Sequence, residues 1–309
     1  DMTAPATLHS RPSGPTGRQR AVAERTARTL TRRRVMNGLM TGVVAVAALV
    51  TTLPLLFILF HLVREGASSI SLDFFTRMPM PPGEAGGGMA NAIVGTLIII
   101  GIACAIGLTV GDGAGLYLAE FRRTKLANTV RFLADVLNGL PSIVLGIFAW
   151  QFLVKPLGRF SAIAGGIALA AMMIPMVTRT TEEMVRLVPT SLREAAMALG
   201  YSRARTAITV VLRTATAGIV TGVLVAVARI AGETAPLLFT AFGNAFWSLR
   251  LDAPIAAMPL QIFAYAISPY DDWRRLAWAG ALVLIALVFI ISVAARFATR
   301  SRLGPGSGD

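Results

Sequence analysis

Two ionisable residues, Arg229 and Glu233, lie four positions apart inside a long apolar run of the sequence. Arginine stays protonated, and at the centre of a membrane-spanning helix it costs roughly 2.5–3.5 kcal/mol on insertion scales, so it should face protein or a water-filled cavity. Glu233 falls on the same helix face and would neutralise it. A guanidinium also offers forked donors to the oxygens of an anion. The pair predicts either an anion pathway or a salt bridge that locks this helix to a neighbour.

Residues 189–206 predict a short helix outside the apolar runs. Ser191 is suited to cap it, and Glu194, three residues later, would complete a capping box. Alanines between them leave one face slim, and Gly200 is suited to end the helix. A slim, exposed helix fits a groove on another protein; the alternative is an ordinary interhelical loop with a good cap.

The sequence lacks the residue patterns that nucleotide hydrolysis, metal binding and covalent catalysis need. A Walker A loop needs Gly-Lys-Ser/Thr, and neither Lys125 nor Lys155 follows a glycine. His9 and His61 have no second ligand at metal spacing, and Cys104 alone cannot form an intrachain disulfide. No Ser/His/Asp arrangement is present either. We therefore expect no enzyme activity, no metal and no cofactor in this chain.

The composition is that of an all-α, polytopic membrane protein. Hydrophobic residues make up 55% and charged residues only 15%, against about 25% charged in a soluble domain. The apolar runs are continuous and reach the roughly 20 residues that a helix needs to cross the hydrocarbon, whereas a β-barrel would show alternating segments. Six spanning helices are predicted, over residues 36–63, 90–118, 132–154, 162–177, 215–241 and 276–297.

The chain divides into a basic, disordered cytoplasmic tail (1–34), a transmembrane domain (35–300) and a short flexible tail (301–309). The net charge of +13 lies mainly in loops and at helix ends, which indicates topology-setting charges in contact with lipid rather than a nucleic-acid surface. Of the 29 lysines and arginines, most fall on one side of the six-helix topology. Both termini are therefore expected in the cytoplasm.

Two features of the apolar runs concern helix packing. Gly107, Gly111 and Gly115 recur every four residues and predict close contact with another helix along one face. Asp112 beside them is expected at a solvated helix end. Pro141 interrupts the third run, where the freed backbone groups suit a kink, either beside a pathway or for packing alone.

The segment around the predicted short helix resembles the coupling motif of ABC importer permeases: Glu-Ala-Ala, a glycine four residues later, then Ile-x-Leu-Pro. The matching residues here are Glu194, Ala195, Ala196, Gly200, Val210 and Leu212. Val210 stands in place of Ile and Arg213 in place of Pro, which leaves only the following turn in question. In that family this helix sits in a cleft of the ATPase subunit and couples it to the pore.

Residues 141–144, 175–183 and 229–241 are similar to segments of permease subunits from bacterial phosphate ABC importers of the PstA type, and the resemblance covers about residues 36–300. It implies the six-helix core of type I importers in the bacterial cell membrane and a substrate pathway that includes Arg229, Glu233, Thr234 and Arg179. Arg179 would serve at the exit side, or equally as a positive-inside anchor.

The resemblance also implies the partners. They are a second permease subunit, a cytoplasmic ATPase dimer that holds ATP and magnesium, and an extracytoplasmic phosphate-binding protein. Two rival interpretations remain open: a permease for another anion such as sulfate or phosphonate, and an ion-gradient-driven transporter with Arg229 and Glu233 as its ion or proton site. A membrane-embedded enzyme is disfavoured by the missing nucleophile and acid–base pair.

Overall fold

The computed structural model describes the backbone of residues 17–84 and 86–300, and side chains from 33 to 297 apart from residue 85. The tail 301–309 and residues 1–16 lie outside this part, as do the predictions of disorder made for them. The chain forms two units, Asp1–His61 and Leu62–Asp309. The described residues are helical and contain no strand, only an isolated bridge between Phe242 and Ile255. The predicted all-α class is confirmed.

Helix α1 (Gly17–Ala67) begins well before the predicted start at residue 36. Residues 18–34, expected to belong to a disordered tail, continue the helix instead. They are rich in Arg and Ala with Gln and Glu, all good helix formers, and contain neither Gly nor Pro. The stretch 33–67 is long and apolar enough to cross a membrane.

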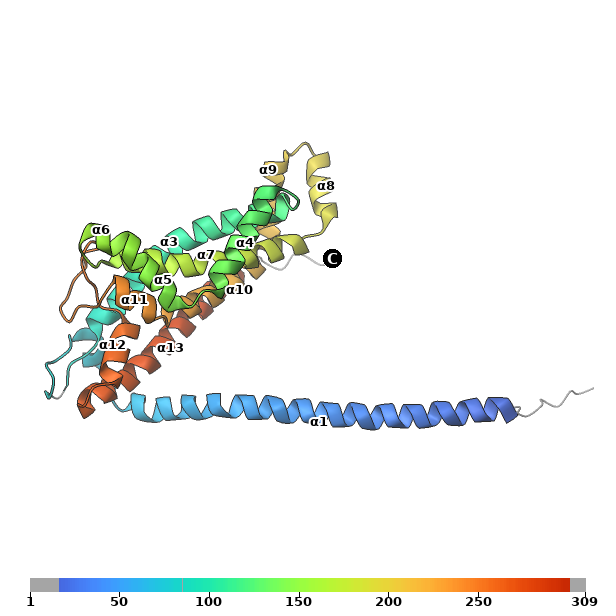
Figure 1. Ribbon diagram of the computed structural model, residues 1–309, viewed down its shortest axis with the longest axis horizontal. Helices are drawn as coiled ribbons and strands as arrows, with labels where there is room; N and C mark the ends of the chain where they lie inside the picture. The colour runs from blue at the N-terminus through green and yellow to red at the C-terminus, as the bar shows by residue number, and fades with distance from the viewer. Residues whose placement is uncertain (1–16, 85, 301–309) are drawn as a thin grey trace, which may run out of the picture. The chain divides into compact units, whose positions relative to one another are not determined.

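The second unit is built around four long helices: α3 (Ala90–Glu120), α7 (Ala162–Leu187), α10 (Leu212–Ala231) and α13 (Asp271–Arg300). Figure 1 shows them running together along the unit, with the hairpin of α8 and α9 at one end and α12 at the other. We call these the α8 end and the α12 end. The short elements are α2 (Leu72–Thr76), α8 (Thr190–Ala198), α9 (Arg203–Thr206), α11 (Ala235–Thr240), α12 (Met258–Ala266) and the π-helical turn η2 (Ala207–Val211).

The third predicted helix is not one rod. Helix α4 (Lys125–Gly139) is followed by a continuous helical stretch made of α5 (Ser142–Ala149), η1 (Trp150–Val154) and α6 (Lys155–Leu157), and the chain bends by 106° between them. Pro141 disfavours the helical conformation at the residue before it, and Leu140 is extended, with φ −74° and ψ 137°. Five helices, α1 included, are long enough to span, and the predicted six are reached when this bent pair counts as one.

Two other predicted helices differ in their ends. Helix α7 continues to Leu187 instead of 177, so Arg179 lies within it. The predicted helix 215–241 is broken: α10, continuous with α9 and η2, ends at Ala231, and α11 starts at Ala235 with Pro236 in its first turn. A proline is tolerated there because the N–H groups of a first turn have no intrahelical partner.

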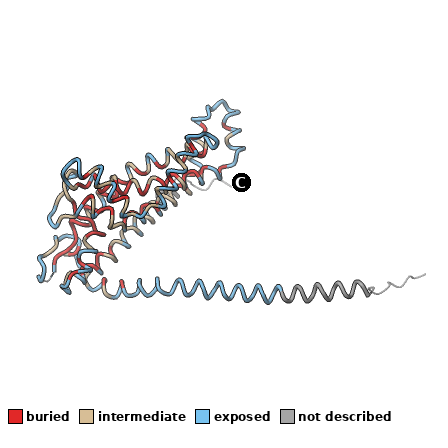
Figure 2. The backbone as a smooth tube through the Cα atoms, in the orientation of Figure 1, coloured by how far each residue is buried: buried red, intermediate tan, exposed pale blue. Residues whose placement is uncertain are grey.

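The most extensive helix–helix contact in the second unit joins α3 to α7 along the predicted glycine stripe. A Cβ on Gly111 would lie 2.7 Å from the Val177 Cβ, and one on Gly115 would lie 2.7 Å from the Thr178 carbonyl oxygen. Both distances are too short for real atoms, so only glycine permits this approach. Figure 2 shows buried residues concentrated in this bundle. Asp112 is not solvated as expected but accepts a hydrogen bond from Thr181 Oγ1, at 2.6 Å, beside the stripe.

Replacing Gly115 by alanine should lower the stability of the folded chain, because the new Cβ would overlap the backbone of α7, which cannot rotate away. Overpacking of this kind costs typically about 1–3 kcal/mol. Gly113 is the matched control, since nothing lies within 4 Å of a Cβ built there, and Gly113→Ala should keep or raise the melting temperature. Thermal unfolding in detergent measures both variants. Equal melting temperatures would contradict the proposed role of the stripe.

Candidate translocation site

The predicted pair Arg229 and Glu233 lies at the break between α10 and α11. Arg229 belongs to the last turn of α10, where a cation is favoured by the helix dipole, and Glu233 follows the helix end at Gly232. The Arg229 Nε lies 4.0 Å from the Glu233 Oε1. The structure therefore brings the two residues together, but through a loose contact and not on one unbroken helix.

Arg229 does not face the interior of its own chain. Its side chain is 50% exposed, whereas that of Glu233 is 20% exposed. On the opposite face of α10, Val227 and Ile230 are buried in the core. Thr234 is half-buried, follows Glu233 directly and makes no capping hydrogen bond to α11. The site is thus an open one, with a guanidinium on the outer surface of an apolar helix.

Arg179 lies in a different group of charges, centred on Glu182. Glu182 is 1% exposed and forms ion pairs with Arg131 (2.7 Å), Arg179 (3.4 Å) and Arg186. Arg179 in addition donates to both carboxylate oxygens of Asp135 on α4, at 3.0 Å from its Nε. No ion pair or hydrogen bond in the described part of the chain joins this group to Arg229. The two arginines predicted for one pathway are therefore held separately.

Arg131 extends this group to the end of α3. Its guanidinium also donates to the carbonyl oxygens of Leu118 (3.0 Å), in the last turn of α3, and of Arg122 (3.2 Å), just beyond the end of that helix. The Glu182 group therefore joins α3, α4 and α7 at the α8 end. The sequence analysis missed Glu182 and Arg131 because it ended α7 at residue 177. The spacing of Arg179, Glu182 and Arg186, three and four residues apart on one helix, was the available signal.

The range 189–206, predicted as one short helix, forms two helices, α8 and α9, and α8 ends where Gly200 was expected to end it. Gly200 has φ +86°, and its N–H donates to the Met197 carbonyl while that of Tyr201 donates to the Ala196 carbonyl, a Schellman motif. The predicted capping box is absent, since Pro189 precedes the first turn and no side chain caps it. Helix α8 therefore starts one residue before the predicted cap.

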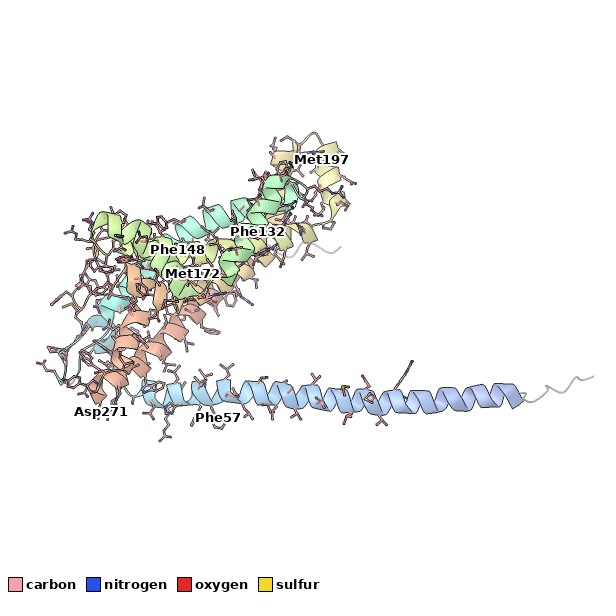
Figure 3. All side chains as sticks on the ribbon, viewed as in Figure 1. Phe57, Phe132, Phe148, Met172, Met197 and Asp271 are labelled. Carbon is pink, nitrogen blue, oxygen red and sulfur yellow. The ribbon has the colours of Figure 1, made fainter. Side chains whose placement is uncertain are left out.

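Most of α8 is exposed. Glu194 and Ala195 are exposed and Ala196 alone is buried, while Leu199 at the helix end is 82% exposed. In Figure 3, Met197 marks this helix at the tip of the projecting hairpin. Exposed apolar side chains next to an acidic residue on a slim helix suit a protein contact.

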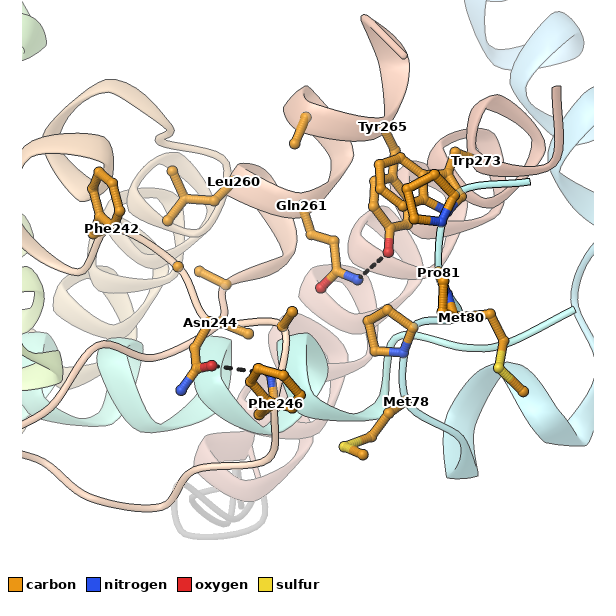
Figure 4. Close-up of a pocket in the computed structure, with 17 residues that line it drawn as sticks. Met78, Met80, Pro81, Phe242, Asn244, Phe246, Leu260, Gln261, Tyr265 and Trp273 are labelled. Carbon is orange, nitrogen blue, oxygen red and sulfur yellow. Dashed lines mark hydrogen bonds between the residues drawn. The ribbon is translucent and has the colours of Figure 1, made fainter. Parts of the chain in front are cut away.

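A pocket at the α12 end is a different kind of site. It has a volume of about 470 Å³, and its lining includes Pro81, Phe242 and Trp273 but no charged residue. Figure 4 shows two of its polar groups engaged locally: the Gln261 amide donates to the Tyr265 hydroxyl at 3.1 Å, and the Asn244 side-chain oxygen accepts from the Phe246 N–H. Such a lining offers an anion no positive charge. Across the part of the chain that the structure describes, no group of His, Cys, Asp or Glu could hold a metal.

A loop beside this pocket carries its own charges. Asp252 pairs with Arg250 and with Arg159, each at 3.1 Å. The hydrogen bonds donated by Arg250 are the main reason that the pKa of the Asp252 carboxyl lies below its ordinary value, and the positive charge of Arg250 adds to this. These pairs connect the segment before α7 to the loop after α11.

Comparisons with known proteins agree with this architecture. Residues 111–302 match the family model of the binding-protein-dependent transport system inner membrane component. The chain is 49% identical over 243 residues to the phosphate transport system permease protein PstA of Yersinia pestis, covering 78% of this chain and 82% of that protein. It is 47% identical over 267 residues to PstA of Xylella fastidiosa strain Temecula1, covering 86% of this chain and 93% of that protein.

Among solved structures, an inward-facing MetNI methionine ABC transporter matches with a TM-score of 0.57 and 19% identity, covering 69% of this chain and 96% of that one. This likeness shows the fold of a type I ABC importer permease. Together with the family match and the apolar helices, this fold identifies a multi-pass inner-membrane permease subunit. The chain belongs to the PstA family of phosphate transport system permease proteins.

Removing the charge of Glu182 should destabilise the α8 end, because Glu182→Gln leaves three arginine side chains close together with one carboxylate fewer. Breaking a buried ion pair from one side costs about 3 kcal/mol or more. The matched control is Glu183→Gln, whose side chain is exposed and whose loss should change stability by no more than about 0.5 kcal/mol. Thermal unfolding in detergent separates the two, and equal stability of both variants would refute the central role of Glu182.

Proposed function

We propose that this chain is the permease subunit of an ATP-driven phosphate importer and forms half of the phosphate pathway, a second permease subunit forming the other half. The observation that carries this proposal is the position of Arg229 in a chain of the PstA family. Its guanidinium is half exposed on a helix long and apolar enough to span the membrane. A protonated arginine is expensive against lipid. A water-filled path between two subunits gives it hydration and an anionic ligand.

The neighbouring groups support weak, reversible binding. Arg229 supplies forked donors for phosphate oxygens, and Glu233 at 4.0 Å reduces the local positive charge, so that the anion is also able to leave. Thr234 adds a neutral hydroxyl at the same break. In this arrangement Pro236 helps to place the break, since it lies in the first turn of α11.

Arg179 is proposed as a second pathway residue, at the exit side. Asp135 and Glu182 occupy its donors in this structure, so an anion would have to displace a carboxylate to bind there. Asp135 is the partner able to yield, because its side chain is 54% exposed while that of Glu182 is 1% exposed.

The coupling of this subunit to ATP is proposed to run through α8. Its exposed Glu194 and Ala195, with Leu199 beyond them, would enter a cleft of the cytoplasmic ATPase dimer, which holds ATP and magnesium; Ala196 and Gly200 keep the helix slim and end it. This places the α8 end and both termini in the cytoplasm, and the α12 end where an extracytoplasmic phosphate-binding protein docks. The permease itself carries out no covalent step.

Hydrolysis of ATP by the reconstituted complex in nanodiscs tests the assignment. We expect stimulation by binding protein with phosphate and none with sulfate in its place, because the pathway and its binding protein are proposed to serve phosphate. Stimulation by sulfate alone would instead support a permease for another anion. Transport in ATP-depleted vesicles under an imposed ion gradient would contradict an ATP-driven mechanism altogether.

Replacing Arg229 by alanine should abolish phosphate uptake into proteoliposomes while the complex stays assembled, because the side chain makes no close contact inside its own chain. Arg229→Lys should retain part of the uptake, since it keeps the charge but loses the fork. Size-exclusion chromatography of the complex is the control for assembly. If Arg229→Ala releases the second permease subunit, the arginine is a structural contact and the pathway role is refuted.

A further inference from the structure

Arg193 is the residue of α8 that reaches back into the membrane domain. Its side chain is 15% exposed, although its neighbour Glu194 on the same helix is exposed. One nitrogen of its guanidinium pairs with Glu120, the last residue of α3, and the other donates to the Val185 carbonyl in the last turn of α7, at 2.9 Å. A single side chain thus connects α8 to the ends of two spanning helices.

The partner of Arg193 stands in an unfavourable place. Glu120 ends α3, where the partial negative charge of the helix terminus disfavours a carboxylate. The pair with Arg193 offsets this cost, and a hydrogen bond that joins two ionised groups is stronger than a neutral one. The acid at this position is therefore best explained by the contact with α8.

Few other contacts hold α8 against the bundle. Ala196 is its only buried residue, and a cavity of about 170 Å³ lies between α8 and the bundle, lined by Glu120 and Arg193 among others. Towards α10 the chain passes through Gly200 in the left-handed conformation, before the continuous helix formed by α9, η2 and α10 begins at Arg203. Towards α7 it passes through Val188 and Pro189, which are extended. On both sides of α8 the helical backbone is therefore interrupted. An interrupted backbone transmits a displacement of α8 less directly than a rigid side-chain contact does.

The receiving side of the contact is rigid. The glycine stripe allows α3 to pack closely against α7. Arg131 hydrogen-bonds both to the end of α3 and to Glu182 of α7, which joins the two helices. A displacement delivered to Glu120 and Val185 would therefore move α3 and α7 as one body.

We infer that Arg193 is the positioning residue through which α8 drives the α3–α7 pair, with Glu120 as its receiving group. This inference rests on the proposed function in one respect, that α8 is the helix that meets the ATPase. Arg193 does not dock the ATPase itself, because its side chain faces the bundle. It converts movement of α8 into movement of the spanning helices.

The test uses the whole complex, reconstituted in proteoliposomes, with Arg193→Gln and Glu120→Gln. Three quantities are measured: the ATPase content of the purified complex, its hydrolysis of ATP, and the phosphate transported per ATP hydrolysed. Both variants should keep the ATPase bound, while phosphate per ATP falls about tenfold, within the usual range of coupling between sites. Arg193→Lys keeps the charge but not both contacts, so its phosphate transported per ATP should lie between that of the parent chain and that of Arg193→Gln. Arg123→Gln, an exposed arginine with no ion pair among the described residues, is the control and should behave as the parent chain.

Glu120 gives the decisive comparison, since it belongs to α3 and not to α8. Unchanged coupling in Glu120→Gln, with coupling lost in Arg193→Gln, would overturn the inference, and so would loss of the ATPase from the Arg193→Gln complex. The proposed docking of α8 fails by a different result, namely an ATPase content and transport that are normal in Glu194→Lys.

Discussion

Three glycines let α3 lie so close to α7 that a single added carbon at Gly111 or Gly115 would overlap the neighbouring helix. In a membrane, helices gain little from hydrophobic burial against one another, so close packing and interhelical hydrogen bonds must hold them together. The stripe supplies the first, and the Thr181–Asp112 hydrogen bond beside it supplies the second. The other helices of the unit are arranged around this pair, and the charges at its α8 end are positioned by it.

The chain places charge near the membrane in two contrasting ways. Glu182 is almost fully buried and satisfied by arginines from α4 and α7. Such a group fixes geometry, because separating any partner leaves an uncompensated charge. Arg229 is half exposed, and its nearest carboxylate is 4.0 Å away. A group with unused donors suits a transient ligand. Arginine therefore fixes structure in the Glu182 group, whereas Arg229 is left half exposed beside a single loose contact, and the burial of the charge distinguishes the two.

Residue spacing was sufficient to predict the glycine stripe, the helical class and the glycine that ends α8, because each depends on local chemistry. The break at Pro141 was anticipated only as a kink, since its size depends on tertiary packing: α5 contacts α11 where Gly146 approaches Pro236, and a Cβ there would lie 2.8 Å from the Pro236 Cα. The Glu182 group was missed for a related reason. Polar residues at 178–187 resemble a loop by composition, and the pairing of Glu182 with Arg131, far away in sequence, is not visible in their local spacing.

The structure also suggests why the predicted coupling helix is joined so sparingly to the rest. A helix packed firmly along its length would dock an ATPase only in one orientation, whereas α8 has a single buried residue and interrupted helix on both sides. A fully loose helix, however, would move without moving anything else. One charged contact, at the end of a rigid helix pair, meets both requirements, because it tolerates rotation of α8 while it resists translation. A sparsely packed α8 next to a closely packed α3–α7 pair is the arrangement that the proposed drive from outside the membrane requires.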